Sequence, residues 1–170
     1  MIQTMNDSIA EVTVVESALH GCVELAGKPI PRGVRERMAL LLARLGALLN
    51  EVADERLVGA GLGGRDYGIL AILATDGPES QYELARMLGK APGMVVGAID
   101  KLEDAGLVER TRDPADRRRS RVTVTAAGTE ALGRADDIAE RTLADIFPRL
   151  DPRELDQLRK LLAKGVAPRA

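Results

Sequence analysis

Residues 80–110 of the chain read SQYELARMLGKAPGMVVGAIDKLEDAGLVER, and this stretch decides the fold. Ser80 and Glu83 match the capping box that starts a helix. Gly89 ends that helix, because glycine accepts the left-handed backbone conformation that follows many helices. Three apolar residues between these limits form the buried face of the helix: Leu84, Ala85 and Leu88.

A second helix follows almost at once. Pro92 suits its first turn, where the missing N–H of proline costs nothing, and Gly106 marks its end. Three apolar residues recur at helical spacing and are expected to point inward: Val95, Ile99 and Leu102. Two short helices joined by a tight turn with glycine are typical of a helix-turn-helix.

The residues after this pair indicate a β-hairpin. LVER at 107–110 and SRVTVT at 120–125 alternate apolar and polar side chains, and the intervening TRDPAD carries Asp-Pro turn chemistry. A helix-turn-helix followed directly by a hairpin is a winged helix. The predicted fold class is therefore mainly α with a small β-hairpin wing, and the winged helix covers about 62–125.

Further helices flank this domain. An apolar stripe from Met38 to Val52 predicts a long helix that runs until the glycines at 59–64, and the residues from Tyr67 to Leu73 predict another before Asp76. Downstream, Thr125 can cap a helix to about Ile146. Asp151, followed by Pro152 and Glu154, begins a final one.

The first residues are predicted to form an additional helix. Ser8 and Glu11 match a capping box, apolar residues then recur to Ala26, and Gly27 ends the pattern. We thus expect an N-terminal extension with an extra helix at 1–30, a helical dimerisation region at 31–61 and 126–165, and the winged helix between them. The dimer follows from the four leucines of the last helix, which need a second copy to cover them: Leu155, Leu158, Leu161 and Leu162.

Composition excludes several classes of protein. The 170 residues are 45% hydrophobic and 29% charged, no apolar run reaches the roughly 18 residues of a membrane span, and the first residues do not resemble a signal peptide. With one cysteine and one histidine, a metal site is not expected, and no cofactor is predicted. The single Cys22 fits a reducing cytoplasm, where we expect the protein to be located.

Positive charge gathers on the predicted wing. Positions 110–121 hold six arginines against two aspartates, a net charge of +4, whereas the whole chain has a net charge of −2. The remaining 158 residues therefore sum to −6. Clustered arginine on a wing is the pattern expected of a surface that neutralises DNA phosphates.

The chain resembles the MarR family of bacterial transcription regulators. ELARMLG, IDKLEDAGLVER, DPADRR and VTVTAAG lie in that family's order and spacing, and the helix layout agrees over about residues 35–163. The resemblance implies a dimer of winged helices on a palindromic DNA operator, often repressing efflux or detoxification genes. It also implies that Asp116 orients Arg118, which enters the minor groove. Small anionic or phenolic compounds, or oxidants, commonly release such dimers.

The chain departs from the family at two points, and both limit which family properties we expect of it. Some branches have an extra N-terminal helix and use tryptophan in a urate pocket, but this chain has no tryptophan, so urate is not expected. The second helix of the pair, the recognition helix, also lacks the usual Ser, Thr and Arg on its outer face. Direct hydrogen bonding to base edges should therefore be sparse. The expected DNA-binding residues are Lys90, Ala91, Pro92, Gly93, Met94, Val96, Gly97, Lys101, Arg112, Asp116, Arg117, Arg118 and Arg119.

The resemblance places an effector pocket between the dimer helices and the winged helix, near 38–52, 65–73 and 130–141. Four polar residues there are candidates for binding a small-molecule effector, although each is also a plausible surface or capping residue: Arg44, Asp66, Tyr67 and Arg134.

Other functions stay open beside this one. The apolar recognition helix also suits a winged helix that binds proteins without specific DNA binding. Cys22 suggests a thiol-based redox sensor, but no basic residues flank it to lower its pKa. Gly59, Gly61 and Gly64 match a dinucleotide-binding motif without the preceding strand that the motif needs. No nucleophile motif is present, so an enzyme is not expected.

Overall fold

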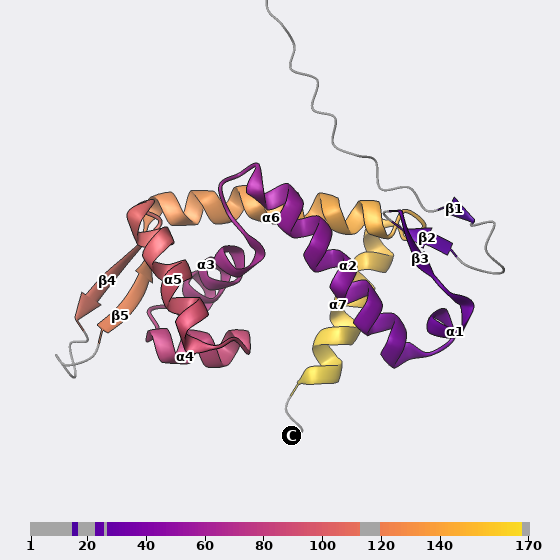
Figure 1. Ribbon diagram of the computed structural model, residues 1–170, viewed down its shortest axis with the longest axis horizontal. Coiled ribbons are helices and arrows are strands. Elements are labelled where there is room, and N and C mark those ends of the chain that lie inside the picture. Colours follow the sequence, from indigo (N-terminus) through magenta and orange to yellow (C-terminus); the bar gives the residue numbers. More distant parts are fainter. Residues whose placement is uncertain (1–14, 17–22, 26, 113–119, 168–170) are drawn as a thin grey trace, which may run out of the picture. The chain divides into compact units, whose positions relative to one another are not determined.

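The computed structural model describes residues 15–16, 23–25, 27–112 and 120–167 (Figure 1). The chain divides into two compact units. One unit consists of Asn50–Glu140, and the other combines Met1–Leu49 with Arg141–Ala170. Two long helices, α2 (Met38–Val58) and α6 (Ala126–Ile146), each contribute residues to both units.

The Asn50–Glu140 unit contains the predicted helix-turn-helix. Its helices are α3 (Gly64–Asp76), α4 (Gln81–Leu88) and α5 (Pro92–Asp104). Ser80 caps α4, since its hydroxyl oxygen accepts the Glu83 backbone N–H at 3.2 Å. Gly89 follows α4 with a φ of 60°, the left-handed conformation that glycine adopts without a steric penalty. The prediction of two short helices with a glycine turn is confirmed.

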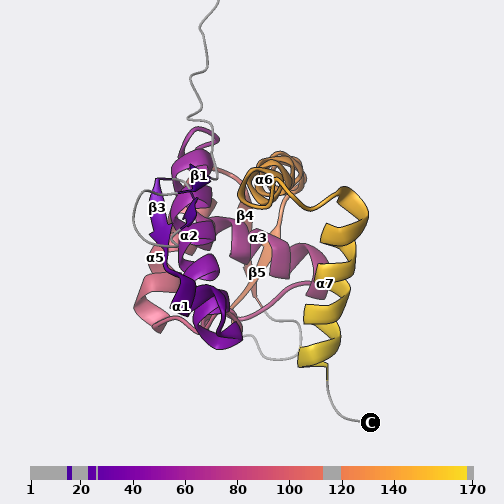
Figure 2. The ribbon, with the colours of Figure 1, turned by 90° about the vertical axis from the view of Figure 1, so that its right-hand side faces the viewer.

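The hairpin follows α5. Strand β4 (Val108–Arg112) pairs antiparallel with β5 (Ser120–Val124), in a register that sets Val108 opposite Val124 and Arg112 opposite Ser120. Glu79, just before α4, exchanges two backbone hydrogen bonds with Val122, of 3.1 and 2.8 Å. The base of the wing is thereby tied to the start of the helix-turn-helix. Figure 2 shows α3 beside the hairpin.

One apolar core holds these elements together. Val95, Ile99 and Leu102 of α5 are buried, as their spacing predicts. Burying a side chain of this size contributes about 1.5–3 kcal/mol, so the core fixes α5 against its neighbours. Other members of the core come from α3, α4 and the hairpin: Ile69, Leu70, Leu73, Leu84, Ala85, Val108 and Val122.

The first turn of α6 closes onto the loop before β4. The Thr125 hydroxyl donates to the Gly106 carbonyl at 2.7 Å and accepts the Gly128 backbone N–H at 3.0 Å, so Thr125 caps α6 as predicted. Gly128 permits this approach, because a Cβ there would lie 2.0 Å from the Leu107 carbonyl oxygen.

The other unit corrects the prediction for the N-terminal region. The described residues there form three short antiparallel strands, β1 (Val15–Glu16), β2 (Val23–Leu25) and β3 (Lys28–Ile30), so the predicted helix is wrong for residues 15–16 and 23–25. Gly27, with a φ of 67°, turns the chain between β2 and β3 rather than ending a helix. The rest of that predicted helix, including Cys22, lies outside the described residues.

The same unit also holds α1 (Arg32–Arg35) and α7 (Pro152–Val166). Asp151 caps α7 in a reciprocal capping box with Glu154, as predicted. None of the α7 residues is buried. None of the described helices combines the length and the apolar composition that crossing a lipid bilayer requires.

Candidate nucleic-acid interface

The start of α5 is an open surface. Every residue from Lys90 to Gly97 is exposed except Val95, which anchors the helix in the core. The first turn of α5 contains no acidic residue, and Lys90 precedes it. The N-terminus of a helix carries a partial positive charge, so this end of α5 is electrostatically suited to a phosphate group.

The outer face of α5 is unusually smooth. A Cβ added to Gly93 or Gly97 would meet no atom within 4 Å. Met94 and Val96 are 48% and 36% exposed and are the large side chains on this stretch. The surface can therefore approach a partner closely, but it offers apolar contact rather than hydrogen bonds to base edges.

Lys101 lies on α5 but already has an internal partner. Its ammonium group lies 2.6 Å from the Asp66 carboxylate, and the side chain remains 57% exposed. The same Asp66 oxygen accepts the Gly63 backbone N–H at 2.9 Å and thereby caps α3. Asp66 thus has a structural role at the start of α3, and Lys101 is held where it also faces solvent.

The tip of the wing is the strongest sequence signal, and most of it falls on residues that the structure does not describe. Arg112, the last residue of β4, is exposed. Asp116, Arg117, Arg118 and Arg119 lie outside the described residues, so their contacts with DNA stay predictions.

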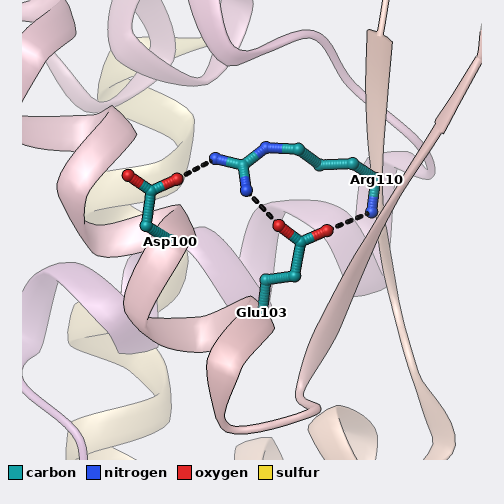
Figure 3. Close-up of polar contacts among 3 residues, drawn as sticks. All are labelled: Asp100, Glu103 and Arg110. Atoms are coloured by element: carbon teal, nitrogen blue, oxygen red, sulfur yellow. Dashed lines mark hydrogen bonds and ion pairs between the residues drawn. The ribbon is translucent and has the colours of Figure 1, made fainter.

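Two of the six arginines in the run, Arg110 and Arg121, have partners within the protein. The guanidinium of Arg110 bonds to Asp100 and Glu103 of α5 (Figure 3), and the Arg110 side chain is only 23% exposed. Burial by itself lowers the pKa of Arg110, but the hydrogen bonds to Asp100 and Glu103 outweigh burial and raise the pKa above its ordinary value. Arg121 also bonds within the protein, donating to the Pro78 carbonyl at 3.4 Å.

Sequence reasoning missed the acidic partners of Arg110. Asp100 and Glu103 are three residues apart, a spacing that places both on one face of a helix. That signal was available in the sequence, but the pairing also depends on the hairpin folding back beside α5, which no local pattern encodes.

Three of the four candidate effector-binding residues have partners within the protein. Asp66 has the two described above, and the Tyr67 hydroxyl donates to Asp136 of α6 at 2.8 Å. Burial, together with Asp136 and Glu140, raises the pKa of Tyr67 to about 12. Arg134 is exposed on α6. Arg44 belongs to the other unit, where it donates to the Pro29 carbonyl at 3.5 Å.

Across the part of the chain that the structure describes, no three His, Cys, Asp or Glu residues gather as metal ligands would.

Comparison with known proteins agrees with this geometry. Residues 65–120 match the model of the MarR family. The HTH-type transcriptional regulator YkoM of Bacillus subtilis is 35% identical over 100 residues, which are 59% of this chain and 65% of YkoM, slightly less than two thirds of its length.

Two solved structures are similar over most of the chain. CouR of Rhodococcus jostii, bound to p-coumaroyl-CoA, is 27% identical with a TM-score of 0.66, over 82% of this chain and 98% of CouR. The MarR family protein Rv2887 of Mycobacterium tuberculosis, in complex with p-aminosalicylic acid, is 28% identical with a TM-score of 0.65, over 77% and 99% of the respective chains.

Proposed function

We propose that this chain, whose residues 65–120 match the MarR family model, is a MarR-type transcription repressor that binds a palindromic DNA operator as a homodimer and releases it when a small molecule binds. The exposed start of α5 carries the proposal. Seven of the eight residues from Lys90 to Gly97 face solvent, and the sequence between the two strands of the hairpin contains Arg117, Arg118 and Arg119. In this arrangement α5 meets the major groove and the wing meets the minor groove and its phosphates.

Exposed apolar side chains support the homodimer. Met38 of α2 is 72% exposed, and Val166 of α7 is 84% exposed. Leaving side chains of this size in water forgoes the hydrophobic stabilisation that a second copy would provide. The same unit exposes five further leucines: Leu40, Leu42, Leu143, Leu161 and Leu162. Sedimentation of the full chain at micromolar concentration should give a dimer, and a monomer there would contradict palindromic recognition.

The ligands of the two solved relatives support a small-molecule effector. CouR was solved with p-coumaroyl-CoA and Rv2887 with p-aminosalicylic acid, both of which combine an aromatic ring with negative charge. We extend this chemical class to the present chain. A hydroxylated aromatic acid or its thioester should raise the thermal midpoint of the protein and weaken its binding to DNA in the same concentration range.

The deciding experiment is a salt titration of DNA binding. The full chain is mixed with a labelled fragment of its own promoter region, and fluorescence anisotropy is followed from 50 to 200 mM salt. A dimer that makes roughly 6–10 phosphate contacts should lose about 10³–10⁵ in affinity over this range. Absence of binding at 50 mM salt would instead favour a winged helix that serves protein contacts.

A further inference from the structure

Arg110 stands in the middle of β4, opposite Val122 of β5, yet its side chain bonds to residues of two helices. Its guanidinium bonds to Asp100 and to one oxygen of Glu103, while the other Glu103 oxygen accepts the backbone N–H of Arg110 itself at 3.0 Å (Figure 3). Glu103 therefore accepts hydrogen bonds from both the side chain and the backbone of Arg110. Because the two bonds meet Arg110 at two points, they restrain the orientation of Arg110 relative to α5 as well as its distance from it.

A third element joins the same guanidinium. With its carboxamide oxygen facing Arg110, Gln81 in the first turn of α4 accepts from Nε at 2.7 Å and from Nη2 at 2.9 Å. One arginine thus connects both helices of the helix-turn-helix to the wing. Arg110, Gln81, Asp100 and Glu103 are called the wing anchor below.

The charge of the wing anchor is opposite to what DNA binding alone would favour. One arginine faces two carboxylates, so this cluster carries net negative charge on the domain that should meet a polyanion. All three nitrogens of the guanidinium are engaged within the protein, which leaves Arg110 poorly placed to bind a phosphate. The two acids therefore need a role that compensates for their repulsion of DNA.

The position of the two acids, between α5 and the wing, indicates such a role. Binding requires α5 and the wing to reach DNA together, and any freedom between them must be lost on binding. Resting on the proposed function, we propose that Arg110 is a positioning residue for DNA binding: held by Asp100, Glu103 and Gln81, it sets the wing at a fixed place relative to α5 before DNA arrives.

The test compares variants of the full chain in the anisotropy titration. Glu103→Gln removes a negative charge, so simple electrostatics predicts tighter binding, whereas loss of positioning predicts binding weakened by about ten-fold. Arg110→Lys keeps the positive charge but loses the several hydrogen bonds that the guanidinium makes, and it should also weaken DNA binding. Arg112→Met is the matched control, since it removes an exposed arginine two residues along the same strand and should lower the salt slope. Arg110→Met should leave that slope unchanged.

A second readout separates positioning from loss of folding. Partial unfolding lowers the fraction of protein that binds in a stoichiometric titration, whereas mispositioning raises Kd with the full fraction still binding. Asp100→Asn, at the more exposed acid of the pair, provides a milder variant that should show the same pattern if Glu103→Gln fails to fold.

The possible results are distinct. Tighter or unchanged binding by Glu103→Gln, or a reduced salt slope in Arg110→Met, overturns the positioning role while the proposed function stands. Absence of DNA binding by the unsubstituted chain overturns the proposed function and the positioning role with it.

Discussion

Lys101 of α5 and Asp66 of α3 form an ion pair of 2.6 Å in which the carboxylate is buried and the ammonium is largely exposed. The next residue, Tyr67, bonds to Asp136 of α6. The first turn of α3 therefore holds the recognition helix through one residue and a long flanking helix through its neighbour. A displacement of α3 would therefore act on both α5 and α6, which is a physical basis for coupling between these two helices.

A double-mutant cycle should reveal the strength of the first link. Lys101→Met leaves the buried Asp66 carboxylate without its cation, and Asp66→Asn removes the charge while keeping a capping oxygen. In urea unfolding the two changes should be non-additive by about 1 kcal/mol. The surface pair Arg86–Glu83 within α4 is the control, with an expected coupling of roughly 0.3 kcal/mol. Additive effects of Lys101→Met and Asp66→Asn would show that the pair contributes nothing.

The second link should be visible as a shifted tyrosine titration. The chain has two tyrosines and no tryptophan, so Tyr82→Phe leaves Tyr67 as the sole phenol. Its ultraviolet absorbance should titrate with a midpoint near pH 12 while circular dichroism still reports helix. Asp136→Asn should move the midpoint down, because it removes the carboxylate that opposes ionisation. A midpoint near 10 in the folded Tyr82→Phe chain would contradict the Tyr67–Asp136 contact.

The free energy of unfolding should depend on pH through the same group, the Tyr67 phenol. The pKa of Tyr67 is raised from 10.0 to about 12 on folding, so its contribution is fully present below pH 10 and is lost as pH rises from 10 to 12. Tyr67→Phe should flatten this part of the pH–stability curve, as measured by urea unfolding.

Sequence predicts the winged helix well because its signals are local. Ser80, Gly89 and Pro92 each act within one helical turn, and the buried positions of α5 follow directly from a period of 3.6. The same holds for the caps at Thr125 and Asp151. Such signals need no knowledge of the rest of the chain.

The parts that sequence missed depend on contacts between distant residues. Leu25 fits the predicted helical stripe, but it also alternates with Val23 as in a strand, and the pairing with Lys28–Ile30 decides between the two. Arg110 looks like any other arginine of the wing until β4 lies beside α5. Its partners, Asp100 and Glu103, precede it by ten and seven residues. A count of charges along the sequence cannot separate such an anchored arginine from an exposed one.

Two glycines of α6 should respond oppositely to alanine. At Gly128 the new Cβ would lie 2.0 Å from the Leu107 carbonyl oxygen, so backbone must shift, at a cost of about 2–3 kcal/mol. At Gly133 a Cβ meets nothing within 4 Å, and the higher helix propensity of alanine should stabilise the fold by about 0.5–1 kcal/mol. Thermal or urea unfolding of the two variants measures both. Equal effects would contradict the close approach of α6 to the loop before β4.

A substitution at Gly97 can distinguish the contribution of α5 to stability from its contribution to DNA binding. A side chain there meets nothing within 4 Å in the free protein, and glutamate has a higher helix propensity than glycine by roughly 0.5 kcal/mol. Gly97→Glu should therefore fold at least as stably as the unsubstituted chain. If the outer face of α5 enters the major groove, however, the same carboxylate faces phosphates at close range and DNA affinity should fall by about ten-fold or more.

Gly133→Glu is the matched control for this substitution. It adds the same residue and the same charge to an exposed helical glycine on α6. Once sedimentation shows that this variant is still a dimer, it reports the effect of net charge, which we expect to be within about two-fold in affinity at 150 mM salt, where distant charges are screened. A loss confined to Gly97→Glu, with unfolding midpoints at or above that of the unsubstituted chain, would assign α5 to the groove. Equal losses in the two variants would mean that only overall charge matters, and α5 would then have no special place in DNA recognition.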